Sequence, residues 1–202
     1  MRFLFCRVGW MQNYKGQYDG DQLIGGGSYV EQCETGSEIH NFTVEQISCD
    51  LLDFGDGDEE LADVCLGYVH YRGQIKLERL GAKPKDEYID NVLVFWVAPH
   101  PDYHDDRLIG WYRNARVYRR HIDPEGEDHG ESHYMDGCVY NIIADVSNCV
   151  LLPECERTYK IPRAKGCCGG IGQANVWYAD GLNDENIIKG ARKKLNDYYN
   201  DR

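Results

Sequence analysis

The segment between Leu108 and Arg120 combines aromatic, amide and cationic side chains. Because the side chains of a β-strand alternate between its faces, a strand here would divide these residues into two sets. One face would carry Ile109, Trp111, Ala115 and Val117, with Arg113 and Arg119 in phase. The other would carry Tyr112, Asn114, Arg116, Tyr118 and Arg120. Rings that stack on bases, amides that read base edges and cations that hold phosphates are the groups that bind nucleic acid. An amphipathic strand with tyrosines and arginines at the surface accounts for the same spacing.

Histidines near carboxylates offer a different chemistry. The residues concerned are His100, His104, Asp105, Asp106, His129 and His133. Histidine and carboxylate ligands would suit a metal-dependent hydrolase. However, Pro101 argues against a helix that would bring the first two histidines onto one face, and the sequence contains no Cys-x-x-Cys pair. We therefore expect neither a metal nor another cofactor, and keep the hydrolase as an alternative.

Two glycine-rich segments could approach a ligand closely through their backbone N–H groups. They cover residues 24–30 (IGGGSYV) and 166–173 (GCCGGIGQ). Neither has the Gly-Lys-Ser/Thr ending of a nucleotide-binding P-loop or the dinucleotide fingerprint after a strand. The sequence therefore argues against an NTPase or a dehydrogenase. Either segment could edge a pocket, and tight turns explain them equally well.

The formal net charge of −12, from 22 basic and 34 acidic residues, opposes a nucleic-acid partner if the charge is evenly spread. It is not evenly spread. Sixteen acids lie in the three windows 50–63, 102–106 and 123–136, whereas the aromatic-rich windows 107–122 and 157–179 contain none. This segregation predicts one basic, aromatic face. The alternatives are ordinary solvated charged faces, or acidic loops that contact a basic protein partner.

The elements that must position these residues are mainly strands. With 202 residues, 42% of them hydrophobic, the chain can form one domain with a sizeable core. Apolar or alternating patterns predict strands at 3–8 and 92–98, a hairpin of 67–71 with 74–80, a β-rich stretch at 139–152 interrupted at 147–148, and a short strand at 175–178. A helix is expected from Asn183 or Asp184 to Tyr199, and a second one around 43–48. The expected fold class is α+β, mainly β, with a barrel and flanking helices.

The same features bear on location. No apolar run approaches the roughly 20 residues of a membrane span, so no membrane partner is expected. Nine cysteines in a chain without an export signal indicate reduced thiols and a cytoplasmic protein.

Five short motifs follow one another along the chain. They are FCRVGWM (5–11), GGGSYV (25–30), LVFWVAPHP (93–101), IGWYRNARVYR (109–119) and GQANVWY (172–178). In this order they resemble the N-terminal, EVE-like domains of bacterial modification-dependent restriction endonucleases, which usually carry an HNH nuclease domain downstream. The resemblance covers about residues 2–178 and implies a PUA-like distorted β-barrel with flanking helices. It also implies that a modified base, most of all a modified cytosine such as 5-methylcytosine, is flipped out of duplex DNA into an aromatic pocket.

Carried onto this sequence, the resemblance implies a set of site residues. The pocket walls would include Trp10, Tyr29 and Trp111, with Tyr112 and Trp177 beside them. The polar edge of the base would be read by Ser28, Asn114, Gln173 and Asn175. The backbone phosphates would be held by Arg113, Arg116, Arg119, Arg120, Arg163 and Lys165.

Residues 1–182 are expected to form this base-binding domain, and residues 183–202 a C-terminal helix that could start a linker to a nuclease domain. The sequence contains no HNH-type segment, so the chain itself is expected to be non-catalytic, with no catalytic residue. The full-length protein is expected to be an HNH endonuclease, and a divalent metal is expected only if a nuclease domain is fused downstream. A nuclease in cis or in trans would then cut double-stranded DNA that carries the modified base, in phage defence. An RNA-binding PUA-like domain is the alternative within the binding proteins.

Overall fold

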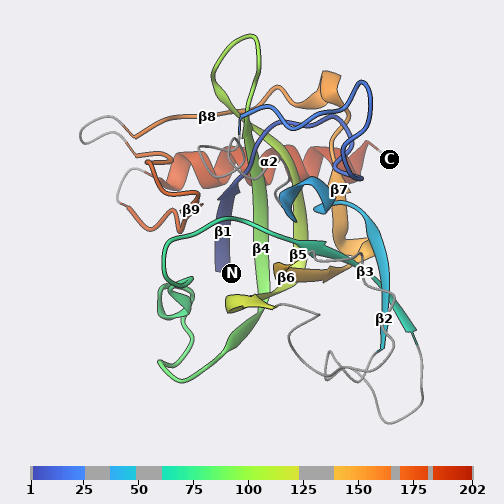
Figure 1. The fold of residues 1–202 in the computed structure, drawn as a ribbon. Coiled ribbons are helices and arrows are strands. Elements are labelled where there is room, and N and C mark those ends of the chain that lie inside the picture. Colours follow the sequence, from blue (N-terminus) through green and yellow to red (C-terminus); the bar gives the residue numbers. More distant parts are fainter. Residues whose placement is uncertain are drawn as a thin grey trace.

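The computed structural model describes residues 2–25, 37–48, 61–122, 139–164, 169–181 and 184–201. Strands dominate this part of the chain (Figure 1). They are β1 (Arg2–Arg7), β2 (Val44–Ser48), β3 (Leu61–Gly67), β4 (Tyr88–Pro99), β5 (Asp106–Ile122), β6 (Tyr140–Asp145), β7 (Cys149–Leu151), β8 (Lys160–Ile161) and β9 (Val176–Trp177). The helical elements are the 3₁₀ turns η1 (Ser37–His40), η3 (Leu77–Leu80), η4 (Val146–Asn148) and η5 (Glu154–Glu156), and the α-helix α2 (Glu185–Asn200).

One mixed sheet holds all nine of these strands, in the order β2-β3-β6-β5-β4-β1-β9, with β7 and β8 also paired to β5. The long strands β4 and β5 form its antiparallel centre, and β1 pairs parallel with β4. The fold is therefore mainly β with a flanking helix, which confirms the expected class. The path through the described strands ends at β2 and β9 without closing, so these strands do not form a complete barrel.

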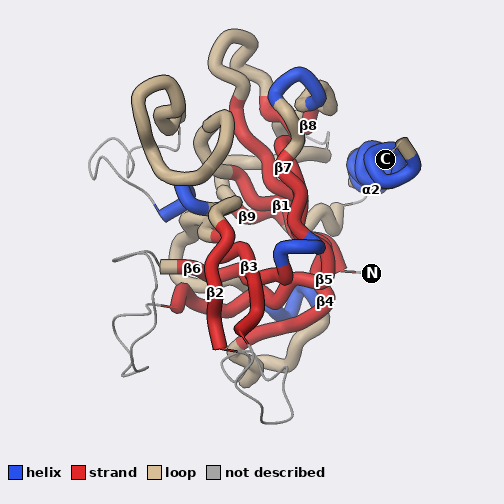
Figure 2. The backbone as a smooth tube through the Cα atoms, turned by 90° about the vertical axis from the view of Figure 1, so that its right-hand side faces the viewer, coloured by secondary structure: helices blue, strands red, loops and turns tan. Residues whose placement is uncertain are grey.

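The sheet separates two large apolar cores, and a smaller third cluster is formed by Ile47, Val64, Tyr140 and Ile143. Within β4, alternate residues point to opposite faces: Val94 and Trp96 enter one core, and Phe95 and Val97 the other. The first core packs against η1, η3 and the segment after β1, and the second is covered by α2 (Figure 2). The helix contributes its buried stripe of Ile187, Ala191 and Leu195 to the second core. The C-terminal helix is thus packed on the same sheet; whether it begins a linker stays a prediction.

Two bulges in β5 overturn the predicted alternation of its side chains. Between the pairs Val97↔Leu108 and Trp96↔Gly110, strand β5 has one extra residue, Ile109. A second extra residue lies near Asn114, whose φ is +50°. Each extra residue reverses the alternation locally. The prediction that Ile109, Trp111, Ala115 and Val117 share one face is therefore wrong, because Trp111 enters the second core and the other three enter the first.

Most predicted elements are confirmed. These are the strands at 3–8, 92–98 and 175–178, the β-rich stretch with its interruption at η4, and the C-terminal helix, whose first turn follows Asp184. The expected helix at 43–48 is wrong, because this segment pairs with β3 as strand β2. The expected hairpin of 67–71 with 74–80 is also wrong. The spacing of Ile75 and Leu77 matches the alternation of a strand. The segment nevertheless ends in a 3₁₀ turn, and Leu77 and Leu80 lie on the buried side of that turn.

Among the helices in the described ranges, none combines the length and the apolar character that a membrane crossing requires.

Candidate functional site

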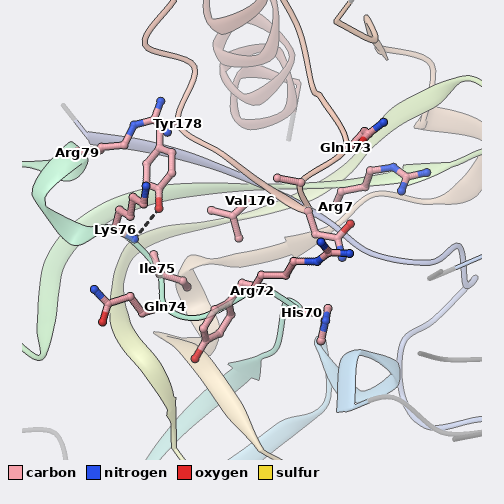
Figure 3. A pocket seen from close by; sticks show the side chains of 13 residues that line it. Arg7, His70, Arg72, Gln74, Ile75, Lys76, Arg79, Gln173, Val176 and Tyr178 are labelled. Carbon is pink, nitrogen blue, oxygen red and sulfur yellow. Dashed lines mark hydrogen bonds between the residues drawn. The ribbon is translucent and has the colours of Figure 1, made fainter. Parts of the chain in front are cut away.

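A cavity of about 650 Å³ opens on the face of the sheet that carries the first core (Figure 3). Its walls come from three parts of the chain: the end of β1, the segment that runs from β3 into η3, and the segment around β9. The lining residues are Arg7, His70, Tyr71, Arg72, Gln74, Ile75, Lys76, Arg79, Gln173, Ala174, Asn175, Val176 and Tyr178.

The segment from His70 to Arg79 is held in place by buried anchors. Ile75 is buried in the first core, and its amide N–H donates to the carbonyl oxygen of Arg119 at 2.9 Å. The Arg119 guanidinium in turn donates to the Glu78 carboxylate at 2.8 Å and to the Asp86 carbonyl at 2.9 Å. These contacts attach η3 to the central strand. The polar residues Arg72, Gln74 and Lys76 lie next to these anchors in the sequence and line the cavity (Figure 3).

Tyr178 joins the two sides of the cavity. Its hydroxyl oxygen accepts a hydrogen bond from the Lys76 amide at 2.7 Å, drawn as the dashed line in Figure 3. The Arg79 guanidinium lies over its ring, 4.0 Å from the centroid, and donates to both carboxylate oxygens of Asp180. Burial raises the pKa of Tyr178, so its hydroxyl stays protonated at neutral pH and keeps a hydrogen to donate.

Arg7 places a second cation at the other end of the cavity. Its backbone N–H donates to the Asn175 carbonyl at 2.7 Å, which fixes the segment before β9 against β1. Its guanidinium donates to the buried carboxylate of Asp106 at 3.0 Å. Arg163 pairs with the same carboxylate. Two guanidinium groups thus share the Asp106 carboxylate, and the buried Glu38 carboxyl also lies within electrostatic reach of Arg7.

Gln173 follows a turn that a buried carboxylate organises. The side chain of Asp184, at the start of α2, accepts from the backbone N–H groups of Gly170 and Gly181 at 3.1 and 3.0 Å. Gly170 has φ +131°, and a Cβ there would meet the Pro162 carbonyl oxygen at 2.2 Å, so only glycine fits. Gly170 therefore forms a tight turn that carries Gln173 to the cavity.

All the charged side chains that line the cavity, as far as the structure describes it, can carry positive charge: Arg7, Arg72, Lys76 and Arg79, with His70 beside them. Of these, Arg72 and Lys76 are exposed and make no ion pair with any described residue. A cavity of this kind favours an anionic ligand. The rings of Tyr71 and Tyr178 and the amides of the lining offer stacking and edge hydrogen bonds to a planar group on that ligand.

The structure brings only two of the residues predicted from the sequence into this cavity, Gln173 and Asn175. Trp10 lies elsewhere and is buried: its indole N–H donates to Glu154 at 3.3 Å, and its ring packs on His100 and Arg157. Trp177 packs on Phe5 from the second core. Ser28, Tyr29 and Lys165 lie outside the described residues.

Trp111 and Tyr112 are corrected from pocket walls to core residues. Both are 0% exposed, and they point to opposite faces of the sheet. Trp111 lies under α2, with its ring 5.2 Å from that of Tyr198, and Tyr112 packs between Trp96 and Phe42. Their strand is the centre of the sheet, where both faces are covered. Neither ring is open to a ligand.

Two predicted phosphate-binding arginines are also corrected, because they are buried in ion pairs. Arg116 donates to Asp90 and lies over the ring of Tyr88, and Arg119 holds η3 through Glu78. Arg163 pairs with Asp106, and Arg120 is exposed on β5 but does not line the cavity. Arg113 and Asn114 line a separate, smaller pocket on the other face of the sheet.

The described residues do not support the predicted metal-binding alternative. Asp105 is paired with Arg107 and Lys160, and Asp106 with two other arginines. In the described ranges, no three His, Cys, Asp or Glu side chains gather in a way that could hold a metal. His129 and His133 lie outside those ranges, as do most of the acidic windows 50–63 and 123–136.

Most of the cavity was missed by reasoning from the sequence. Arg7, Tyr71, Arg72, Lys76, Arg79 and Tyr178 were not selected. Arg72 and Gly73 were interpreted as a hairpin turn, and Arg7 and Tyr178 stood inside motifs without a role. The available signal was the run from His70 to Arg79, which contains Arg72, Lys76 and Arg79 in addition to the histidine, against a single acid, Glu78.

Comparisons of this chain with protein-family models, curated proteins and solved structures give no match. The resemblance to EVE-like domains therefore stays a hypothesis, and the function must be argued from the cavity.

Proposed function

We propose that this chain is a non-catalytic DNA-binding reader that accepts an extruded, modified base in the cavity between residues 70–79 and 173–178. The observation that carries the proposal is the charge of that cavity. The lining charges among the described residues are cationic, in a chain whose formal net charge is −12. Such a local reversal of sign selects for a polyanion and positions it on one face.

The lining residues divide the work of holding one nucleotide. Arg72 and Lys76 are exposed at the cavity and are the candidates for the flanking phosphates. The rings of Tyr71 and Tyr178 offer stacking surfaces for the base. The amides of Gln74, Gln173 and Asn175 each present a donor and an acceptor, as recognition of a base edge requires.

The size and energetics of the cavity agree with this proposal. Its volume of about 650 Å³ lies within the roughly 300–1,000 Å³ usual for ligand pockets. Extruding a base from duplex DNA costs a few kcal/mol, and stacking on an aromatic ring returns about 1–3 kcal/mol. Because the rest of the chain is acidic, binding should depend on filling the cavity and non-specific affinity should be weak.

The resemblance to EVE-like domains supplies the choice of a modified cytosine and the cellular setting. We propose a cytoplasmic role in restriction of foreign DNA, with the nuclease supplied in cis or in trans. The four cysteines that the structure describes, Cys6, Cys65, Cys149 and Cys155, are free thiols, which agrees with a reducing compartment.

The proposal is tested by gel-shift titrations at fixed salt. The probes are one duplex carrying cytosine, 5-methylcytosine or 5-hydroxymethylcytosine at a single position, with a single-stranded RNA of the same sequence as competitor. We expect tighter binding of one modified duplex. The double variant Arg72→Gln with Lys76→Gln should lose this preference, and Lys189→Gln, on the opposite face of the sheet, should keep it. Equal affinity for all three duplexes would refute the modified-base proposal, and preferential competition by the RNA would point to the RNA-binding alternative.

A further inference from the structure

A second pocket, of about 330 Å³, lies between α2 and the central strands, on the face that carries the second core. The cavity described above borders the first core, so the sheet separates the two. The second pocket is built at the irregular part of the β4–β5 pair. Asn91 on β4 and Asn114 on β5 both line it, with φ of +59° and +50°, near the register shifts of their strands. Strained backbone of this kind is often found at binding sites.

Arg113 brings an unsatisfied donor to this pocket. Its guanidinium lies over the ring of Tyr199, 4.3 Å from the centroid. Its Nε atom is buried and has no hydrogen-bond partner among the described residues. A buried donor of a charged group without an acceptor is costly, and such groups are uncommon in folded proteins. An acceptor supplied by a ligand would remove that cost.

Arg192 on α2 supplies a second guanidinium to the same pocket. The lining amides are those of Asn91, Asn114 and Asn196, and no acidic side chain belongs to the described lining. The acids next in sequence to these residues are already paired: Asp90 with Arg116, and Asp197 with Lys193. The pocket therefore has a surplus of positive charge and of N–H donors.

We propose that this pocket is a second anion site that binds a phosphate group. A carboxylate has two oxygens and is satisfied by one guanidinium, whereas two guanidinium groups and three amides match the larger number of acceptors on a phosphate. Leu93 and Leu195 form an apolar wall, against which the carbon part of a phosphate ester packs. The phosphate belongs either to a small organic phosphate or to a DNA backbone, and both present the same group.

The unpartnered Arg113 Nε–H provides a direct readout. We would record the arginine Nε–H signals of the ¹⁵N-labelled full chain by NMR while adding inorganic phosphate, and separately while adding an unmodified DNA duplex. The Arg113 signal is expected to move with phosphate, and the apparent Kd to rise about tenfold in Arg192→Gln. Arg120→Gln, which removes an exposed arginine from the same strand, and Arg72→Gln, which alters the first cavity, should leave the titration with inorganic phosphate unchanged, because neither residue lines the second pocket.

Each outcome decides the proposal. A response of Arg113 to both additions supports a phosphate site open to either source, and a response to the duplex alone assigns the site to the DNA backbone. No movement of the Arg113 signal at tens of millimolar phosphate and saturating duplex would overturn it. Equal movement of all arginine signals, in the wild type and in Arg192→Gln, would also overturn it, because that pattern is non-specific screening. The Arg72→Gln titration separates this result from a failure of the first cavity.

Discussion

The Arg79 guanidinium lies 4.0 Å from the centroid of the Tyr178 ring, and this contact joins the two walls of the cationic cavity. Arg79 belongs to η3 and Tyr178 follows β9, so nearly a hundred residues of chain separate two side chains that act together. The Tyr178 hydroxyl also accepts a hydrogen bond from the Lys76 amide, and the Arg79 guanidinium donates to the carboxylate of Asp180. Tyr178 therefore fixes the guanidinium of Arg79 and the backbone of Lys76, one of the two cations proposed to meet DNA.

Substitutions of Tyr178 should separate the role of its ring from that of its hydroxyl. Tyr178→Ala removes the ring beneath Arg79 and a stacking surface, and should weaken binding of the preferred duplex at least about tenfold. Tyr178→Phe keeps the ring and loses only the acceptor for the Lys76 amide, so a smaller loss is expected. Gel-shift titrations of both variants, with circular dichroism to check folding, measure this difference. Equal losses in the two variants would contradict a stacking role.

Arg72 and Lys76 should govern the salt dependence of binding. The binding constant falls as salt rises, so log K against log salt has a negative slope. Arg72→Gln and Lys76→Gln should each make this slope less steep by about 1, because each variant loses one phosphate contact. Lys189→Gln is the control, because this exposed lysine lies on α2, on the opposite face of the sheet from the cavity. Titrations at several salt concentrations give the slopes. If the control makes the slope less steep by as much as the cavity variants do, DNA does not meet the protein at this cavity.

Trp111 should matter for stability and leave recognition intact. Its side chain is fully buried under α2, so Trp111→Ala should cost about 3–5 kcal/mol in the free energy of unfolding. Trp111→Phe keeps an aromatic ring in the core and should bind DNA like the wild type. Urea unfolding and gel shifts on the same preparations measure the two effects. A stable Trp111→Phe protein with impaired binding would restore Trp111 to the site.

The case of Trp111 shows what sequence patterns can and cannot predict here. Strands β1, β4 and β9 and helix α2 follow from local patterns, because burial on one or two faces leaves a periodic trace in the sequence. The face of the sheet to which each β5 side chain points could not be predicted in this way. The extra residues at Ile109 and near Asn114 reverse the alternation, and the alternating pattern of the sequence does not reveal them. The cavity combines β1, the residues before η3 and the segment around β9, and only tertiary pairing brings these together.

Arg157 should be among the most important single residues for stability. It is 1% exposed and donates to the carbonyl oxygens of Leu152, Met11 and Gln12 at 2.6–2.8 Å. Arg157→Met would leave these buried acceptors without partners and should destabilise the fold by about 3 kcal/mol or more. Arg157→Lys keeps the charge but lacks the planar fork, so it should recover only part of the loss. Urea unfolding measures both variants, with Arg120→Gln as an exposed control; a loss below about 1 kcal/mol in Arg157→Met would contradict this role.

Glu38 should make the stability of the fold depend on pH. Burial raises the pKa of its carboxyl group from 4.5 to about 7, although the Gly9 N–H, which donates to it at 3.0 Å, and the charge of Arg7 lower it. Between pH 4.5 and 7 the folded protein keeps a proton that the unfolded chain has lost, so stability falls as the pH rises through this range. The change amounts to about 3 kcal/mol.

Glu38→Gln isolates this effect, because the neutral amide still accepts from Gly9 but does not ionise. Near pH 4.5 the variant and the wild type should have similar free energies of unfolding. At pH 8 the variant should be more stable by about 3 kcal/mol, with most of the difference appearing below pH 7. Urea unfolding of both proteins across this range measures it, and the other titrating groups cancel in the comparison. A difference that stays constant from pH 4.5 to 8 would show that Glu38 ionises alike in the folded and unfolded chain.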